Sequence, residues 1–216
     1  MMSTTGYQIR QCERPECALR YPIVEEHIFG LSCPCCGAKT RMVVAKELNP
    51  EPGNLASFSS ELVIEVLLDN VRSAWNVGSM FRTADGLGIH HMYLCGVTPT
   101  PENVKVTKTS LGAEKTVTWS QHNDGVKKVL KLKQQGYRLW ALEKDDRSEK
   151  INKTLYDIDG PQIILVVGNE VCGVDPGILE LCERTVHIPM IGLKRSFNVA
   201  VAFGIASHML VYGNGA

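Results

Sequence analysis

Three things are missing from this sequence of 216 residues: a net charge, a long apolar run and a secretory signal. The 23 Lys and Arg residues balance the 23 Asp and Glu residues. No apolar run approaches the roughly 20 residues that span a bilayer, and the opening MMSTTGYQIRQCERPEC lacks the apolar stretch of a signal peptide. We therefore expect a cytoplasmic protein with no membrane partner. Any binding to nucleic acid must depend on a local patch of charge rather than on the overall field.

Two glycine-rich motifs are also absent, namely the G-x-G-x-x-G dinucleotide fingerprint and the phosphate-binding P-loop. Their absence argues against a nucleotide-dependent oxidoreductase or kinase. What is present is enough apolar sequence, 44% of residues, for one good core and a small appendage.

One segment is unevenly charged. Between Lys105 and Lys133, seven lysines stand against two acidic residues, a local surplus of five. Such a surplus suits RNA phosphates. A solvated helix face whose charge is balanced elsewhere produces the same pattern, so charge alone leaves both interpretations open.

Five of the eight cysteines fall within the first 36 residues. The stretches QCERPEC and SCPCCG give a C-x4-C pair and, after fifteen intervening residues, a C-x2-C pair; the four residues are Cys12, Cys17, Cys33 and Cys36. Four thiolates at this spacing hold Zn2+ tetrahedrally, and a segment too short for its own core needs such a metal to fold. We therefore predict a zinc-ribbon-like module over residues 8–45 with a structural zinc ion.

Alternatives to this ligand set stay open. Cys35 could replace Cys36, and His27 could replace one cysteine. Disulfides are disfavoured because no secretory signal is present. The module resembles the zinc ribbons of nucleic-acid and translation proteins, many of which are only structural. Residues 46–59 carry two prolines and a glycine without apolar periodicity, which predicts a linker before a main domain over residues 60–216.

From residue 60 onward, apolar strands alternate with helices. Strands are predicted at 61–69, 90–96, 116–119, 137–143, 162–168 and 185–190. Helices are predicted from Asn76 to Gly88, from Asn123 or Asp124 with a core stripe of Val126, Val129, Leu130 and Leu132, from Asp175 with Pro176 first, and over 199–212. Continuous apolar strands alternating with helices indicate an α/β fold, with a mostly parallel sheet covered by helices on both faces.

Polar residues follow three of these strands, where ligands of such sheets gather. In LLDNVRSAWNVGSMFRTADGLG, Asn76 has the character of a helix cap. Arg82 follows six residues later on a helix whose apolar residues we expect to face the core, so it sits either beside the buried side or at a site. A guanidinium in that position needs an anionic or multi-acceptor partner, and its fork suits phosphate.

The other two clusters are weaker when each is taken singly. In VVGNEVCGVDPG, a strand ends at Gly168 and Glu170 follows, which an ordinary β-to-α turn would also produce. In IPMIGLKRSFNVAVAFG, Ser196 and Asn198 precede an apolar helix. There they can cap its free amides, and the same helix start can seat an anionic or polar ligand.

Taken in order, the motifs N-x-G-x-x-x-R-T, G-N-E-x-x-G and I-P-M followed by S-F-N resemble the three motifs of the SpoU (TrmH-like) branch of the SPOUT RNA methyltransferases. The resemblance covers residues 61–212, and KTSLGAEKTV at 108–117 is similar to a segment of that family. The resemblance implies methyl transfer from S-adenosylmethionine to a ribose 2′-hydroxyl in structured tRNA or rRNA. It also implies a C-terminal trefoil knot and a homodimer with the site near the subunit interface. The ribbon lies outside it.

The resemblance also implies roles for individual residues. Gly168, Ile188 and Phe197 would contact the cofactor largely through backbone, with Met190 and Leu142 as neighbours. Phe197 stands where the family most often has leucine, a change that an apolar contact tolerates.

Arg82 matches the catalytic arginine of the family. Because a guanidinium with a pKa above about 12 is a poor base, we expect Arg82 to grip a phosphate and stabilise the developing alkoxide. Asn76, Ser196 and Asn198 would orient the arginine and the ribose, and Glu170 would anchor loop backbone or a group of the partner subunit. The alternative is a catalytically inactive RNA-binding protein, against which the complete motif set argues.

Overall fold

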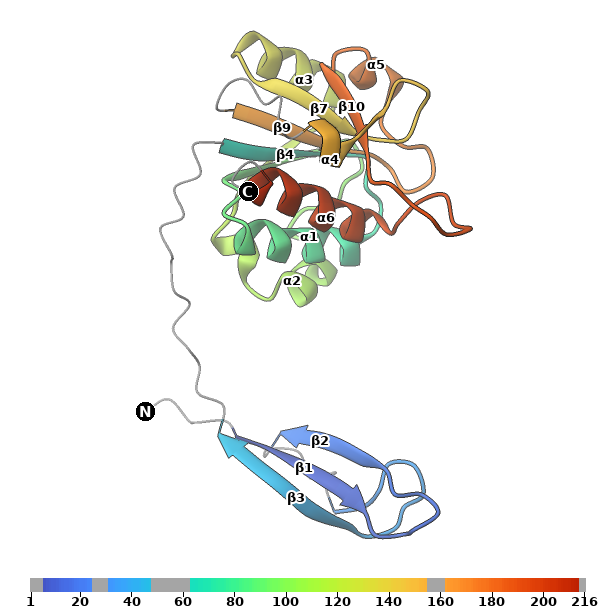
Figure 1. Ribbon diagram of the computed structural model, residues 1–216. Coiled ribbons are helices and arrows are strands. Elements are labelled where there is room, and N and C mark those ends of the chain that lie inside the picture. Colours follow the sequence, from blue (N-terminus) through green and yellow to red (C-terminus); the bar gives the residue numbers. More distant parts are fainter. Residues whose placement is uncertain (1–5, 25–30, 48–62, 155–161, 214–216) are drawn as a thin grey trace. The chain divides into compact units, whose positions relative to one another are not determined.

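The computed structural model describes residues 6–24, 31–47, 63–154 and 162–213. The chain divides into two compact units, Met1–Phe58 and Ser59–Ala216 (Figure 1). Within the described ranges, no helix has both the length and the apolar character needed to cross a membrane.

The first unit contains a three-stranded antiparallel sheet in the order β2-β1-β3. Its strands are β1 (Gly6–Cys12), β2 (Arg20–Val24) and β3 (Thr40–Glu47). Strand β3 continues through Lys46 and Glu47, which the sequence analysis assigns to the linker. The remainder of that linker, residues 48–59, lies outside the described residues.

The second unit is built on a seven-stranded sheet in the order β6-β5-β4-β9-β7-β10-β8, and every pairing in it is parallel. The strands are β4 (Val63–Asp69), β5 (His91–Cys95), β6 (Thr118–His122), β7 (Arg138–Leu142), β8 (Glu149–Lys150), β9 (Gln162–Val167) and β10 (Arg184–His187). The predicted α/β fold with a mostly parallel sheet is confirmed.

Helices cover both faces of this sheet (Figure 1). One face carries α1 (Ala74–Gly86), α2 (Val104–Ser110), the 3-10 helix η2 (Ala113–Lys115), α4 (Ile151–Thr154) and α6 (Val199–Tyr212). The other face carries α3 (Gly125–Gln134) and α5 (Pro176–Leu179). Because successive strand residues point to opposite faces, β4 serves both cores: Val66 and Leu68 pack under α1 and α6, while Leu67 packs under α3 and α5.

Several predicted boundaries were wrong by a few residues. Helix α1 begins at Ala74 because Ser73 is its cap, with the Ser73 hydroxyl accepting from the Asn76 amide at 3.3 Å, and it ends at Gly86 rather than Gly88. In α3, Leu130 is 40% exposed rather than part of the core stripe. Strand β6 starts at Thr118, two residues later than predicted, and β10 stops at His187. The sequence analysis did not predict α2.

The lysine-rich segment does not form a single patch. Lys105 and Lys108 lie on α2, which packs beside α1, whereas Lys127 and Lys128 lie on α3 on the opposite face of the sheet (Figure 1). The seven-stranded sheet therefore separates the two groups of lysines.

Candidate active site

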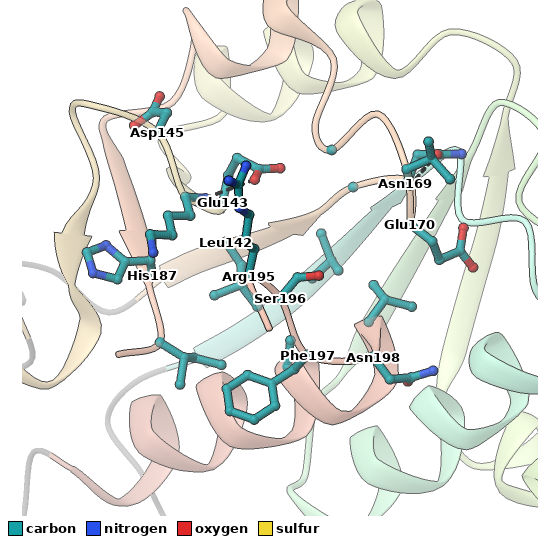
Figure 2. Close-up of a pocket in the computed structure, with 18 of the residues that line it drawn as sticks. Leu142, Glu143, Asp145, Asn169, Glu170, His187, Arg195, Ser196, Phe197 and Asn198 are labelled. Carbon is teal, nitrogen blue, oxygen red and sulfur yellow. Dashed lines mark hydrogen bonds between the residues drawn. The ribbon is translucent and has the colours of Figure 1, made fainter. Parts of the chain in front are cut away.

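A cavity of about 760 Å3 opens at the carboxyl ends of β7, β9 and β10. Figure 2 shows its three sources: Glu143 and Asp145 follow β7, Asn169 and Glu170 follow β9, and Ser196 to Asn198 lead into α6. The five residues chosen from the sequence as cofactor contacts all line it: Leu142, Gly168, Ile188, Met190 and Phe197. Segments far apart in the sequence thus form one wall, because parallel strands end at the same edge of the sheet.

Of the residues given catalytic roles in the sequence analysis, Glu170, Ser196 and Asn198 line the cavity, whereas Asn76 and Arg82 do not. Asn76 nevertheless joins the group through hydrogen bonds. Its side-chain nitrogen donates to Oε1 of Glu170 at 3.3 Å, and its side-chain oxygen accepts from the side-chain NH2 group of Asn198 at 3.2 Å. One residue from each polar cluster therefore belongs to a single hydrogen-bonded chain.

Glu170 binds the start of α1. Its carboxylate accepts from the backbone amides of Arg72 at 3.0 Å and Ser73 at 3.1 Å, in addition to the Asn76 side chain. Desolvation alone would raise the pKa of Glu170, but these donors outweigh it and hold the pKa below its ordinary value. The negative charge also suits the positive end of the helix dipole.

Asn198 is the cap of α6, as the sequence predicts. Its side-chain oxygen accepts from the amides of Ala200 at 2.9 Å and Val201 at 3.4 Å, which leaves its NH2 group free to reach Asn76. Ser196 is exposed and makes no hydrogen bond with any residue that the structure describes.

The loop after β9 is closed on itself. Asn169 and Gly173 exchange backbone hydrogen bonds of 2.9 and 3.0 Å, and the Asn169 side chain accepts from the amides of Val171 and Cys172. A Cβ on Gly168 would overlap the backbone of Gly173 and Val174. Gly173 itself has φ +74°, a region that favours glycine. The two glycines of the G-N-E-x-x-G motif are therefore required by the conformation of this loop.

Arg82 lies on the solvent side of α1, so of its two expected positions, beside the buried face or at a site, the first is wrong and the second stays a prediction. Arg82 shares an exposed stripe with Ser79 and Trp75, which lie one and two turns earlier on the helix, respectively. Its guanidinium forms no hydrogen bond or ion pair with the described residues. The packed side of α1 instead includes Gly78, where a Cβ would overlap the Thr109 side chain and the Val106 carbonyl of α2.

A match to the SpoU rRNA Methylase family covers residues 63–208. The chain belongs to this family. The tRNA (guanosine(18)-2′-O)-methyltransferase of Aquifex aeolicus (strain VF5) is 34% identical over 142 residues, which are 65% of this chain and 64% of that protein. The chain therefore spans slightly less than two thirds of the length of this relative.

Solved structures of SpoU proteins have the same fold. The crystal structure of the A. aeolicus TrmH/SpoU tRNA modifying enzyme matches with a TM-score of 0.61 and 29% identity, over 68% of this chain and 73% of that one. The AdoMet-bound rRNA methyltransferase from Sinorhizobium meliloti matches with a TM-score of 0.64 over 71% of this chain and 57% of that one. At 23% identity, this second likeness is one of fold alone.

Glu143 is a cavity residue that the motif analysis of this SpoU protein missed. It follows β7, and its carboxylate accepts from the amides of Lys144 at 2.9 Å and Val174 at 3.1 Å. Its own amide donates to the Val186 carbonyl at 3.0 Å. The one signal in the sequence was its place as the last residue of a predicted strand, at the edge where the other site residues gather.

Outside the SpoU match, four cysteines of the first unit form a cluster. The Sγ atoms of Cys12, Cys17, Cys33 and Cys36 all lie within 4.8 Å of one another. Cys35 is exposed and outside this group, and His27 lies outside the described residues. Burial would raise the pKa of Cys33, but the amides of Cys36 and Cys35 outweigh it and lower the pKa to about 7.

Proposed function

We propose that this protein transfers the methyl group of S-adenosylmethionine to a ribose 2′-hydroxyl in structured RNA, either tRNA or rRNA. The observation that carries the proposal is that the loops after β7, β9 and β10 converge on one cavity, and two of these loops carry family motifs. The remaining motif is joined to them through Asn76, which is hydrogen-bonded to Glu170 and Asn198. The name of the A. aeolicus relative supports the chemistry, because that protein methylates a tRNA guanosine on the 2′-oxygen.

The cavity fits such a cofactor in size and character. Its volume of about 760 Å3 is within the range of small-molecule pockets. Leu142, Ile188 and Phe197 offer apolar wall for an adenosine group. The charged lining comprises four carboxylates, Glu143, Asp145, Asp146 and Glu170, and two cations, Lys144 and Arg195. The partly buried carboxylates Glu143 and Asp145 suit a sulfonium, which supplies an already activated methyl group, whereas solvent screens the exposed Asp146.

The remaining residues align the RNA. We assign to Arg82 the grip on a phosphate and the stabilisation of charge that develops on the 2′-oxygen, because its exposed guanidinium has no partner among the described residues. Asn76, Ser196 and Asn198 orient the ribose, and the chain of hydrogen bonds from Glu170 through Asn76 to Asn198 holds their backbone elements together. No metal enters this chemistry.

We propose a homodimer on the basis of α6. This helix is apolar apart from Ser207, His208 and the hydroxyl of Tyr212, and Val201 and Tyr212 remain 49% and 43% exposed in the single chain. Just before it, Ile191 and Leu193 are fully exposed. An apolar helix of this kind gains stability when a second copy covers it. The second copy would then lie close to the cavity.

We propose that the cysteine cluster binds a structural zinc ion. A tetrahedral site with Zn–S bonds of about 2.3 Å places sulfurs about 3.8 Å apart. The observed Sγ separations are 3.5 Å for Cys12 and Cys36 and 3.7 Å for Cys17 and Cys33. The donor set and the spacing both fit zinc, with Cys36 rather than Cys35 as the fourth ligand.

Two further proposals concern the fold and the location of the protein. One is a trefoil knot in the C-terminal part of the second unit, which rests on the family alone; the other, a cytoplasmic location, keeps the sequence expectation given above and fits the RNA substrates in the names of the relatives.

The decisive experiment incubates the purified protein with labelled S-adenosylmethionine and separate pools of tRNA and rRNA, followed by mapping of 2′-O-methylated positions. New methylation that needs the protein supports the proposal. Arg82→Ala should abolish methylation while cofactor affinity, measured by calorimetry, stays unchanged. An inactive RNA-binding protein would bind RNA in a filter assay and methylate nothing, which would refute the enzymatic assignment.

A further inference from the structure

The cavity contains one carboxylate whose position is fixed by loop backbone and which forms no ion pair with any residue that the structure describes. Glu143 accepts from the amides of Lys144 and Val174 and forms no ion pair with any described residue. The Glu143 carboxylate also lies close to Gly173, because a Cβ added to Gly173 would overlap it. Glu143 therefore connects the end of β7 to the loop after β9.

The other acidic residues of the cavity are differently placed. Asp145 accepts from the Arg147 amide at 2.9 Å and pairs with the Arg147 guanidinium at 3.6 Å. Glu170 accepts from the amides at the positive end of α1. Asp146 is exposed, and solvent screens it. Among the four, Glu143 is the partly buried carboxylate that forms no ion pair within the described residues and does not bind the start of α1.

The proposed reaction changes the charge of the cofactor. The donor carries a positive sulfonium. When the 2′-oxygen forms a bond to the methyl carbon, the carbon–sulfur bond breaks, its electron pair stays on sulfur as a neutral thioether, and the hydroxyl proton is released to phosphate or water. A fixed, weakly screened carboxylate in the cavity favours the donor over this product.

We propose that Glu143 is the residue that makes the cofactor site prefer the cationic donor S-adenosylmethionine to the neutral product S-adenosylhomocysteine. The inference rests on the proposed function, because it assumes that this cavity holds the cofactor. Because its carboxylate accepts from the Val174 amide, Glu143 also holds the loop after β9 against the end of β7.

The experiment measures the dissociation constants of both compounds by calorimetry for the full chain and three variants. Glu143→Gln is nearly isosteric and removes the charge, so the donor-to-product affinity ratio should fall by about tenfold. Glu143→Asp retains the charge but shortens the reach to the Val174 amide. Both affinities should then weaken while their ratio stays near that of the unaltered protein.

Asp146→Asn is the matched control, because it removes the same charge from an exposed position on the same cavity. Its affinity ratio should change little. The proposal is overturned if Glu143→Gln lowers both affinities by one common factor, or if Asp146→Asn reduces the ratio as much. Failure of the proposed function looks different: the unaltered protein would then bind neither compound and methylate no RNA.

Discussion

The side-chain amide of Asn198 donates to the side-chain oxygen of Asn76 at 3.2 Å, although the two residues are 122 positions apart in the sequence. Each belongs to the start of a different helix: Asn198 caps α6, and Asn76 lies in the first turn of α1. The contact joins two of the three polar clusters, and Glu170 joins the third. Capping and function therefore involve the same side chains.

Replacing Asn198 separates these two roles. Asn198→Ala removes the cap of α6 and should lower the free energy of unfolding by about 1 kcal/mol. Asn198→Asp keeps a capping oxygen but loses the amide that donates to Asn76. It should retain stability in urea titrations and still lose methylation activity. Equal destabilisation by both substitutions would contradict the assignment of the cap.

Gly78 is required for the contact between α1 and α2. Gly78→Ala places a Cβ against the Val106 carbonyl and the Thr109 side chain, so we expect a loss of roughly 1–3 kcal/mol in unfolding free energy. Gly86→Ala is the control in the same helix, because its added Cβ meets nothing within 4 Å. It should leave stability unchanged or increase it by up to about 1 kcal/mol. Similar denaturation midpoints for the two variants would exclude the packing explanation.

Glu170 predicts a pH dependence of stability. Its pKa is lowered in the folded protein, so its contribution is complete above the ordinary glutamate value of 4.5 and is lost as pH falls through the lower, folded value. Glu170→Gln should therefore be less stable than the unaltered protein at pH 7. The difference should shrink as pH falls below 4.5. Urea midpoints across this range test the sign, and a difference that grows on acidification would refute it.

Zinc content should distinguish the neighbouring cysteines of the CPCCG knuckle. Cys33→Ser and Cys36→Ser should each release the metal and unfold the first unit, because a structural zinc site supplies the folding energy of such a small segment. Cys35→Ser should retain one zinc ion per chain, since Cys35 is exposed and outside the cluster. Metal analysis of the purified variants decides this. Zinc loss from Cys35→Ser alone would reverse the ligand assignment.

The exposed apolar side of α6 should control assembly. Val201→Lys places a charge at the proposed dimer contact and should yield monomers in sedimentation experiments. Val104→Lys is the matched control, because Val104 is 62% exposed on α2, away from α6. Its sedimentation should equal that of the unaltered protein. A monomeric unaltered protein at micromolar concentration would refute the dimer.

Local patterns predicted much of the second unit. The strand from Val63 and the cap of α6 at Asn198 both follow from a few adjacent residues, and both are present. The start of α1 was misplaced because Ser73 and Asn76 are both good capping residues and only the backbone conformation distinguishes them. The apolar residues of α1 that we expected to face the core are buried. The pattern left two positions open for Arg82, beside that face or at a site, and the structure shows its side chain exposed to solvent.

Contacts across the sheet were beyond such patterns. Glu143 gave almost no signal, because its partner Val174 lies 31 positions away and is reached through a backbone amide that any residue has. The lysine-rich segment looked continuous in the sequence, yet the chain passes from α2 to α3 through β6 and so crosses to the other face.

The amino-acid sequence by itself determined the elements, the order of the motifs and the grouping of four cysteines by their spacing, because caps, alternation and spacing are properties of neighbouring residues. Only the tertiary structure decided that Asn76, Glu170 and Asn198 meet and that Arg82 faces solvent. Those outcomes depend on which strands lie side by side, and the strand order is set by the packing of two apolar cores on one sheet.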